Sequence, residues 1–178
     1  MTDESWLGAP TVEETAYHEA GHIVVASAVG LHLRQAGLVI WEGVNGYFGC
    51  AAIWEDEQWD KQWDKQLCCL RAGAKAQLRR YPSSSAMWGS HKDDDEIFDI
   101  VRKHFNGQWS DMEEKIDTQV DILLENNWSA VDAVAQAVIA GDWKPAEDQG
   151  IKATRKKQLD GVTLEAILET HGIPAVVR

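Results

Sequence analysis

The sequence lacks a long apolar run and is short of basic residues. Lysine and arginine number 17 against 29 aspartates and glutamates, which gives a formal net charge of −12. A chain this acidic is a poor binder of nucleic acid and is repelled by anionic membrane surfaces. No stretch approaches the roughly 20 consecutive apolar residues of a membrane span, and the acidic start, Met1 to Trp6, lacks the basic and apolar regions of a signal peptide. We therefore expect a cytoplasmic protein with no membrane span and no nucleic-acid partner.

Cysteines are also few. The three present, Cys50, Cys68 and Cys69, cannot all pair within one chain, and two adjacent cysteines do not have the C-x-x-C spacing of a thiolate site. The pattern therefore argues against a disulfide framework and against a thiolate zinc centre. We expect buried thiols in a reducing compartment.

Several catalytic motifs are absent. The sequence has no G-x-x-x-x-G-K-[S/T] phosphate loop, so it carries no ATPase of that type. It has no nucleophile elbow of the G-x-S-x-G type. The H-E-x-x-H sequence at residues 18–22, described below, is not followed by the H-x-x-G-x-x-H extension of metzincins. These absences exclude ATP-driven chemistry within this sequence and narrow the zinc-enzyme classes that fit.

What is present suits one compact domain. The chain has 178 residues, of which 44% are hydrophobic and 26% charged, as in ordinary globular proteins. Nine tryptophans are unusual. In a small domain they supply core volume more often than a ligand platform, and we expect Trp59 and Trp63, at helical spacing with later apolar residues, to belong to the core.

The apolar periodicity predicts a mainly α fold with a small β-hairpin or sheet (α+β). Pro10 and a capping box of Thr11 and Glu14 mark the start of a helix that runs to about Val29. Two β-favouring segments around Asn45-Gly46 predict a hairpin. Further helices are expected over 57–80, from 93, from 110 with a second capping box (Ser110 and Glu113), over 129–140 and over 163–171. Residues 145–160, with the run Arg155-Lys156-Lys157, are expected to be a charged linker.

One local pattern points to chemistry: His18-Glu19-Ala20-Gly21-His22, an H-E-x-x-H motif. Residues four apart lie on one face of a helix, so both imidazoles can reach a single ion. Zinc accepts imidazole nitrogens, and a catalytic site keeps an open position where the pKa of bound water falls to about 7. Glu19 can take a proton from that water and deliver it to the leaving amine.

The other histidines carry weaker signals. His32 lies just past the first predicted helix, where a capping or surface role is expected. His104 falls on an apolar helical face and is expected to be a satisfied core residue rather than a ligand. His171 lies in the polar C-terminal part.

The residues around the motif resemble the metal-binding helix of the FtsH-type (M41) zinc metallopeptidases, which read A-x-H-E-A-G-H followed by small and apolar residues. Three further segments are similar to that family, and together the matches cover about residues 11–143. These segments are Leu70-Arg-Ala-Gly-Ala-Lys-Ala-Gln-Leu78, Gly89-Ser-His-Lys-Asp93 and Asn127-Trp-Ser-Ala-Val-Asp-Ala-Val-Ala135.

The resemblance implies an M41-like zinc peptidase domain over residues 1–144, followed by a polar linker and a short C-terminal helix over 145–178. It makes Asp93 the third zinc ligand, with Asp94, Asp95 and His91 as alternatives. Gln77 stands where the family has glutamate, which puts any supporting role of that carboxylate in doubt. Full-length members of that family carry a membrane anchor and an AAA+ ATPase. Because neither is seen in this sequence, we expect a free-standing peptidase domain.

The sequence thus predicts a zinc-dependent metallopeptidase that hydrolyses peptide bonds, with His18, His22 and Asp93 as ligands and Glu19 as general base. Its partners would be peptides or unfolded proteins, and a separate ATPase partner stays open. The hairpin around Tyr47 to Trp54 could take an extended substrate as an added strand. The alternatives are an inactive zinc-binding or protein-interaction module with the same fold, and a helical scaffold without metal.

Overall fold

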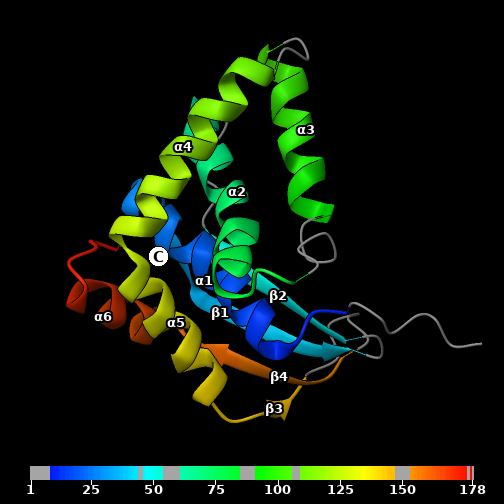
Figure 1. The fold of residues 1–178 in the computed structure, drawn as a ribbon. Coiled ribbons are helices and arrows are strands. Elements are labelled where there is room, and N and C mark those ends of the chain that lie inside the picture. Colours follow the sequence, from blue (N-terminus) through cyan, green and yellow to red (C-terminus); the bar gives the residue numbers. More distant parts are fainter. Residues whose placement is uncertain are drawn as a thin grey trace, which may run out of the picture.

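Helices surround a small antiparallel sheet in the computed structural model, which describes residues 9–43, 46–53, 61–84, 91–105, 109–146, 153–175 and 177 (Figure 1). The predicted mixed class, mainly helical with a small sheet, is confirmed. Within these residues no helix is long and apolar enough to cross a bilayer. The helices are α1 (Val12–Ala28), α2 (Trp63–Arg80), α3 (His91–Phe105), α4 (Ser110–Asn126), α5 (Trp128–Ala140) and α6 (Gly161–Thr170), and the strands are β1 (Leu33–Gly43), β2 (Gly46–Ile53), β3 (Lys144–Pro145) and β4 (Ala153–Leu159).

The sheet has the strand order β2-β1-β4-β3, and every pairing of these strands is antiparallel. The predicted hairpin is β1 and β2, with Trp41 opposite Phe48 and Gly43 opposite Gly46. Two residues of its turn, 44 and 45, lie outside the described residues. Because β1 has β4 on its other side, β2 is left at the edge of the sheet.

The expectation of a charged linker over 145–160 is wrong for residues 153–159, which form β4 beside β1. Along β4, Arg155 and Lys157 point to the same face as Leu159, because side chains alternate along a strand. Arg155 bonds Glu42 across the strands at 2.5 and 2.8 Å. The buried Lys157 donates to carbonyl oxygens at the end of α5. Partners distant in sequence therefore turn this basic run into part of a sheet.

Helix α1 lies at the centre of the molecule. It packs against α2, α5 and the β1–β2 hairpin (Figure 1), and its residues from Thr15 to Ser27 are all buried. Burial around the whole circumference matches a helix enclosed on all sides. The predicted capping box at its start is confirmed, with Thr11 and Glu14 bonding each other's backbone N–H groups at 3.1 and 2.8 Å. The chemistry-bearing motif therefore sits on the most buried element.

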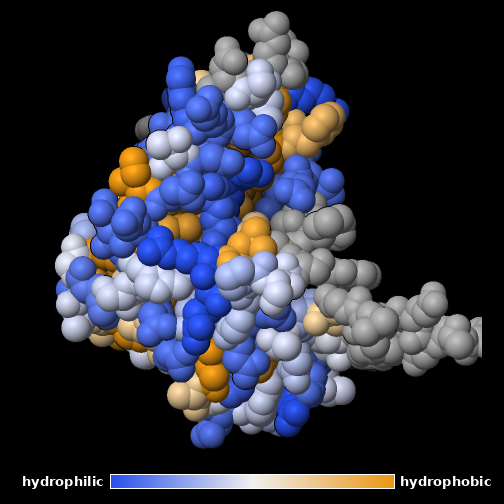
Figure 2. Space-filling model, viewed as in Figure 1, coloured by the Kyte–Doolittle hydropathy of each residue, from blue (hydrophilic) through white to orange (hydrophobic). Residues whose placement is uncertain are grey.

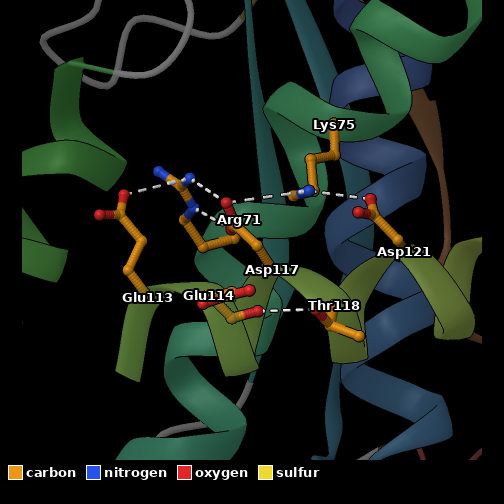
Figure 3. Close-up of polar contacts among 7 residues, drawn as sticks. All are labelled: Arg71, Lys75, Glu113, Glu114, Asp117, Thr118 and Asp121. Carbon is orange, nitrogen blue, oxygen red and sulfur yellow. Dashed lines mark hydrogen bonds and ion pairs between the residues drawn. The ribbon is translucent and has the colours of Figure 1, made fainter. Parts of the chain in front are cut away.

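Helices α2 and α4 are joined by a row of ion pairs (Figure 3). Arg71 binds Asp117 through two hydrogen bonds of 2.8 and 2.9 Å and lies 3.5 Å from Glu113, and Lys75 lies 2.8 Å from Asp121. The expected second capping box is therefore wrong: Glu113 faces Arg71, and α4 begins after Trp109 with no side-chain cap. Figure 2 shows a mostly hydrophilic surface over these helices, broken by separate apolar patches.

Two side-chain expectations need correction and two are confirmed. His104 is exposed rather than in the core, and its ring stacks on Trp63 with centroids 6.1 Å apart. Cys68 and Cys69 are buried free thiols, as expected, but Cys50 is exposed. Trp63 is half-buried and packs against the core, which confirms its structural role, whereas Trp59 lies outside the described residues.

Candidate metal centre

Two helices bring the predicted ligands together. One turn of α1 places His18 and His22 on the same face, with ring centroids 4.7 Å apart. The first turn of α3 places Asp93 Oδ2 at 3.1 Å from His18 Nε2 and 3.2 Å from His22 Nε2. One potential ligand atom from each residue lies within 4.8 Å of the others, and in the described part of the chain no other group of three or more His, Cys, Asp or Glu residues is arranged in this way. Asp94 and Asp95 do not belong to this group, and the side chain of His91, the third alternative on this helix, lies outside the described part of the chain.

The outer nitrogen of each imidazole is held by an oxygen that can only accept a hydrogen bond. His18 Nδ1 lies 3.0 Å from Gln77 Oε1, and His22 Nδ1 lies 2.7 Å from the Cys69 carbonyl oxygen. Both Nδ1 atoms therefore carry a hydrogen, which leaves the Nε2 atoms to face Asp93. Partners of this kind orient the histidine ligands in metal sites.

The contacts of Gln77 show what this side chain does in place of the family's glutamate. The residue is 1% exposed, and its amide nitrogen donates to Ser84 Oγ at 2.7 Å. The Ser84 hydroxyl in turn bonds the Glu14 carboxylate. Because the amide nitrogen has its own acceptor, the amide oxygen is directed at His18. A neutral glutamine thus supports His18 at the position where the FtsH-type peptidases, which this segment resembles, have a glutamate.

The electrostatics of the cluster require a positive charge between its members. Two Nε2 lone pairs and a carboxylate cannot face one another at 3.1 to 3.2 Å without a proton or a cation between them. Burial alone would lower the pKa of His22, but the Asp93 carboxylate outweighs it and holds that pKa well above its ordinary value. Burial would raise the pKa of Asp93, and the two imidazoles instead hold it far below its usual range.

Helix α2 approaches the cluster closely because it has no side chain at Gly73. A Cβ atom at this position would lie 2.7 Å from His18 Nε2 and 2.6 Å from His22 Cε1, closer than real Cβ atoms approach other atoms. The absent methyl group therefore leaves space beside the atoms that would bind a metal. A nitrogen, nitrogen and oxygen donor set with this free space fits a zinc ion with three protein ligands and an open position.

Glu19 lies beside the cluster and against strand β2. It is 7% exposed, and burial raises its pKa above the ordinary value although His22 and His18 act in the opposite direction. Its carboxylate accepts a hydrogen bond from the Ala51 backbone N–H. A Cβ atom at Gly49 would lie 2.6 Å from Glu19 Oε1, so the side chain crosses the strand where β2 has no side chain of its own.

A cavity of about 260 Å³ opens beside these residues. Residues 49–53 of β2 form one wall of this cavity, and Gln66 and Leu70 of α2 form another. Arg34, Lys92 and Asp93 also line it. A wider hollow of about 760 Å³ follows the outer face of α4 from Glu114 to Leu123. That hollow adjoins none of the candidate ligands, so the smaller cavity is the candidate site.

The sequence identified the four polar groups of the site and missed the backbone that surrounds them. The Cys69 carbonyl, the Ala51 N–H and the two close approaches at Gly49 and Gly73 were not foreseen. Isolated glycines within a predicted helix or strand are signals of close approach. Gly73 also lies inside a segment that resembles the peptidase family, which could have drawn attention to it.

Comparisons with known proteins do not identify this chain. A scan against protein-family models gives no match, and a search of curated proteins finds no significant relative. The function is therefore inferred from the geometry of the site.

Proposed function

We propose that this protein is a zinc-dependent metallopeptidase that hydrolyses peptide bonds. The observation that carries the proposal is the convergence of His18, His22 and Asp93 beside a buried glutamate, at a cavity bounded by the edge strand of the sheet. The resemblance of several segments to FtsH-type (M41) peptidases supports the same conclusion.

The three ligands favour zinc among common metals. Two imidazoles and one carboxylate match the ligand sets of catalytic zinc sites, whereas magnesium and calcium prefer oxygen ligands throughout. Bound zinc would supply a Lewis acid that polarises the scissile carbonyl and lowers the pKa of a water molecule to about 7. The hydrogen bonds that the two imidazoles donate to Gln77 and to the Cys69 carbonyl keep both rings oriented for this ion.

Glu19 supplies the proton transfers. A general base works best when its pKa lies near the working pH, and burial raises the pKa of Glu19 in that direction. It would take a proton from the attacking water molecule and later give it to the amine that leaves. A binding site without catalysis has no need of a buried glutamate in this position.

The edge strand β2 offers a binding surface for an extended peptide. Its residues 49–53 line the cavity, and its outer side has no partner strand in the described sheet. An extended chain can pair with such an edge through backbone hydrogen bonds, while alternate side chains enter neighbouring pockets. A cavity of about 260 Å³ is small, so we expect it to accept one substrate side chain and the substrate to be a peptide or an unfolded segment.

Metal analysis combined with casein cleavage tests the proposal. We expect one zinc per chain, cleavage of labelled β-casein that stops on adding a chelator, and loss of cleavage in Glu19→Gln with zinc still bound. Glu13→Gln, an exposed change on the same helix, is the matched control and should keep full activity. Zinc without cleavage of casein or of a peptide library would indicate a non-catalytic zinc module, and a protein that binds no zinc would refute the proposal.

A further inference from the structure

The general base and the substrate-binding edge meet at one backbone group. Strand β2 is at the edge of the sheet, with β1 on one side only. The Glu19 carboxylate lies over Gly49 and accepts a hydrogen bond from the Ala51 N–H. A side chain of α1 therefore occupies part of the surface to which a peptide would pair.

The direction of the Ala51 N–H follows from the pairing of the hairpin. In an antiparallel pair, the backbone groups of successive residues point alternately toward the partner strand and away from it. The Gly43–Gly46 pair closes the two-residue turn and is hydrogen-bonded, so the alternation makes Leu38–Ala51 a pair without hydrogen bonds between the two strands. This N–H therefore faces the open edge, where an added strand would need it.

We propose that Glu19 and an incoming peptide compete for the Ala51 N–H, and that Gly49 is the positioning residue which makes this contact possible. The proposal rests on strand addition as part of the proposed function. In the free protein the Glu19 carboxylate holds the N–H group. A peptide that pairs with β2 takes the N–H through its own carbonyl oxygen, and Glu19 then turns from the strand toward the ligand cluster.

Gly49 is required because Glu19 passes directly over its Cα atom. A methyl group there would lie 2.6 Å from Glu19 Oε1 and 2.7 Å from Cδ, so the side chain would have to move away from β2. The Gly49→Ala substitution should therefore break the bond to Ala51 without altering any titratable group. A Cβ atom at Gly141, at the end of α5 and outside the cavity lining, would lie no closer than 3.3 Å to another atom, so Gly141→Ala is the matched control.

Hydrogen exchange of the Ala51 amide tests the contact directly, in metal-free protein and without substrate. We expect slow exchange in the wild type, in Glu19→Gln, which keeps an acceptor oxygen, and in the control Gly141→Ala. Exchange should be at least tenfold faster in Glu19→Ala and in Gly49→Ala. Equal rates in the wild type and Glu19→Ala would overturn the proposal.

Binding of labelled β-casein in the presence of a chelator tests the competition. Glu19→Ala should bind casein at least threefold more tightly than the wild type, because the Ala51 N–H is free, whereas Glu19→Gln should bind with unchanged affinity. Failure of Glu19→Ala to gain affinity would refute the competition. Both measurements need neither zinc nor cleavage, so their outcome is independent of the metal and activity tests of the proposed function.

Discussion

Replacing Gln77 tests whether this residue supports His18 as a proposed metal ligand, as the geometry indicates. Gln77→Leu keeps the approximate size of the side chain but removes both the oxygen that accepts from His18 and the nitrogen that donates to Ser84. Gln77→Glu keeps an acceptor for His18 and adds a negative charge next to it. The two variants separate the hydrogen bond from the charge.

The expected size of the effect follows from the burial of these groups. Loss of a supporting hydrogen bond to a metal-binding histidine weakens metal affinity by about 10- to 100-fold, which corresponds to about 1.4–2.7 kcal/mol. Gln77→Leu leaves the buried His18 N–H without an acceptor. It should therefore also lower the stability of the metal-free protein by roughly 1–3 kcal/mol. Gln77→Glu should bind zinc at least as tightly as the wild type, because a carboxylate makes the imidazole more basic.

Zinc affinity is measured by competition with a chelating dye, and stability by urea unfolding in chelator, so that the two effects are recorded separately. Gln119→Leu, the same change on the exposed face of α4, is the control and should alter neither quantity. A zinc affinity of Gln77→Leu within threefold of the wild type would show that this residue does not support the site, whatever happens to stability.

Three further perturbations have defined outcomes. Without zinc, the raised pKa of His22 adds stability that is complete below its unfolded pKa of about 6.5 and is lost as the pH rises through the folded value. The thermal midpoint in chelator should therefore fall as the pH rises above about 6.5, and a flat or rising midpoint would contradict this. The depressed pKa of Asp93 keeps its contribution to stability until the pH falls below about 4. Gly73→Ala should reduce zinc affinity at least 100-fold by dye competition, because its methyl group would displace a ligand from bonds of about 2.0–2.1 Å, and unchanged affinity would show that the site lies elsewhere. Lys157→Met should cost roughly 1–3 kcal/mol in urea unfolding through loss of its bonds to the end of α5, whereas Lys156→Met should cost less than about 0.5 kcal/mol, and equal costs would argue against the contact.

The parts of the fold that the sequence predicts are those in which local pattern and tertiary position agree. The first helix begins at the predicted capping box because Thr11 and Glu14 satisfy each other's backbone groups whatever surrounds them. The spacing of His18 and His22 fixes their common face for the same reason. Asp93 could be placed only through resemblance, because no local pattern indicates which residue of a distant helix completes a cluster.

Strand β4 was not predicted because its stability comes from partners remote in sequence. A segment with three consecutive basic residues resembles a solvated linker when judged by its own composition. In the fold, Arg155 pairs with Glu42 of β1 and stacks over Trp143. Lys157 donates hydrogen bonds to carbonyl oxygens at the end of α5. The charges of Arg155 and Lys157 are satisfied by contacts that exist only once the sheet has formed, so a local pattern carries no signal of them.

An H-E-x-x-H motif names the groups that could bind and use a metal, but it says nothing about whether the facing elements leave room for them. Here that room depends on two positions without side chains. Gly73 lets α2 approach the imidazoles, and Gly49 lets Glu19 lie across β2. A methyl group at the first would occupy space beside the nitrogens of the proposed ligands, and at the second it would displace Glu19, the proposed general base, from the strand. An accidental motif would impose no such requirement on a helix more than 40 residues away or on a strand of the sheet. The two glycines therefore offer a test of the proposed site that the motif alone does not, and their alanine variants are the experiments that carry it out.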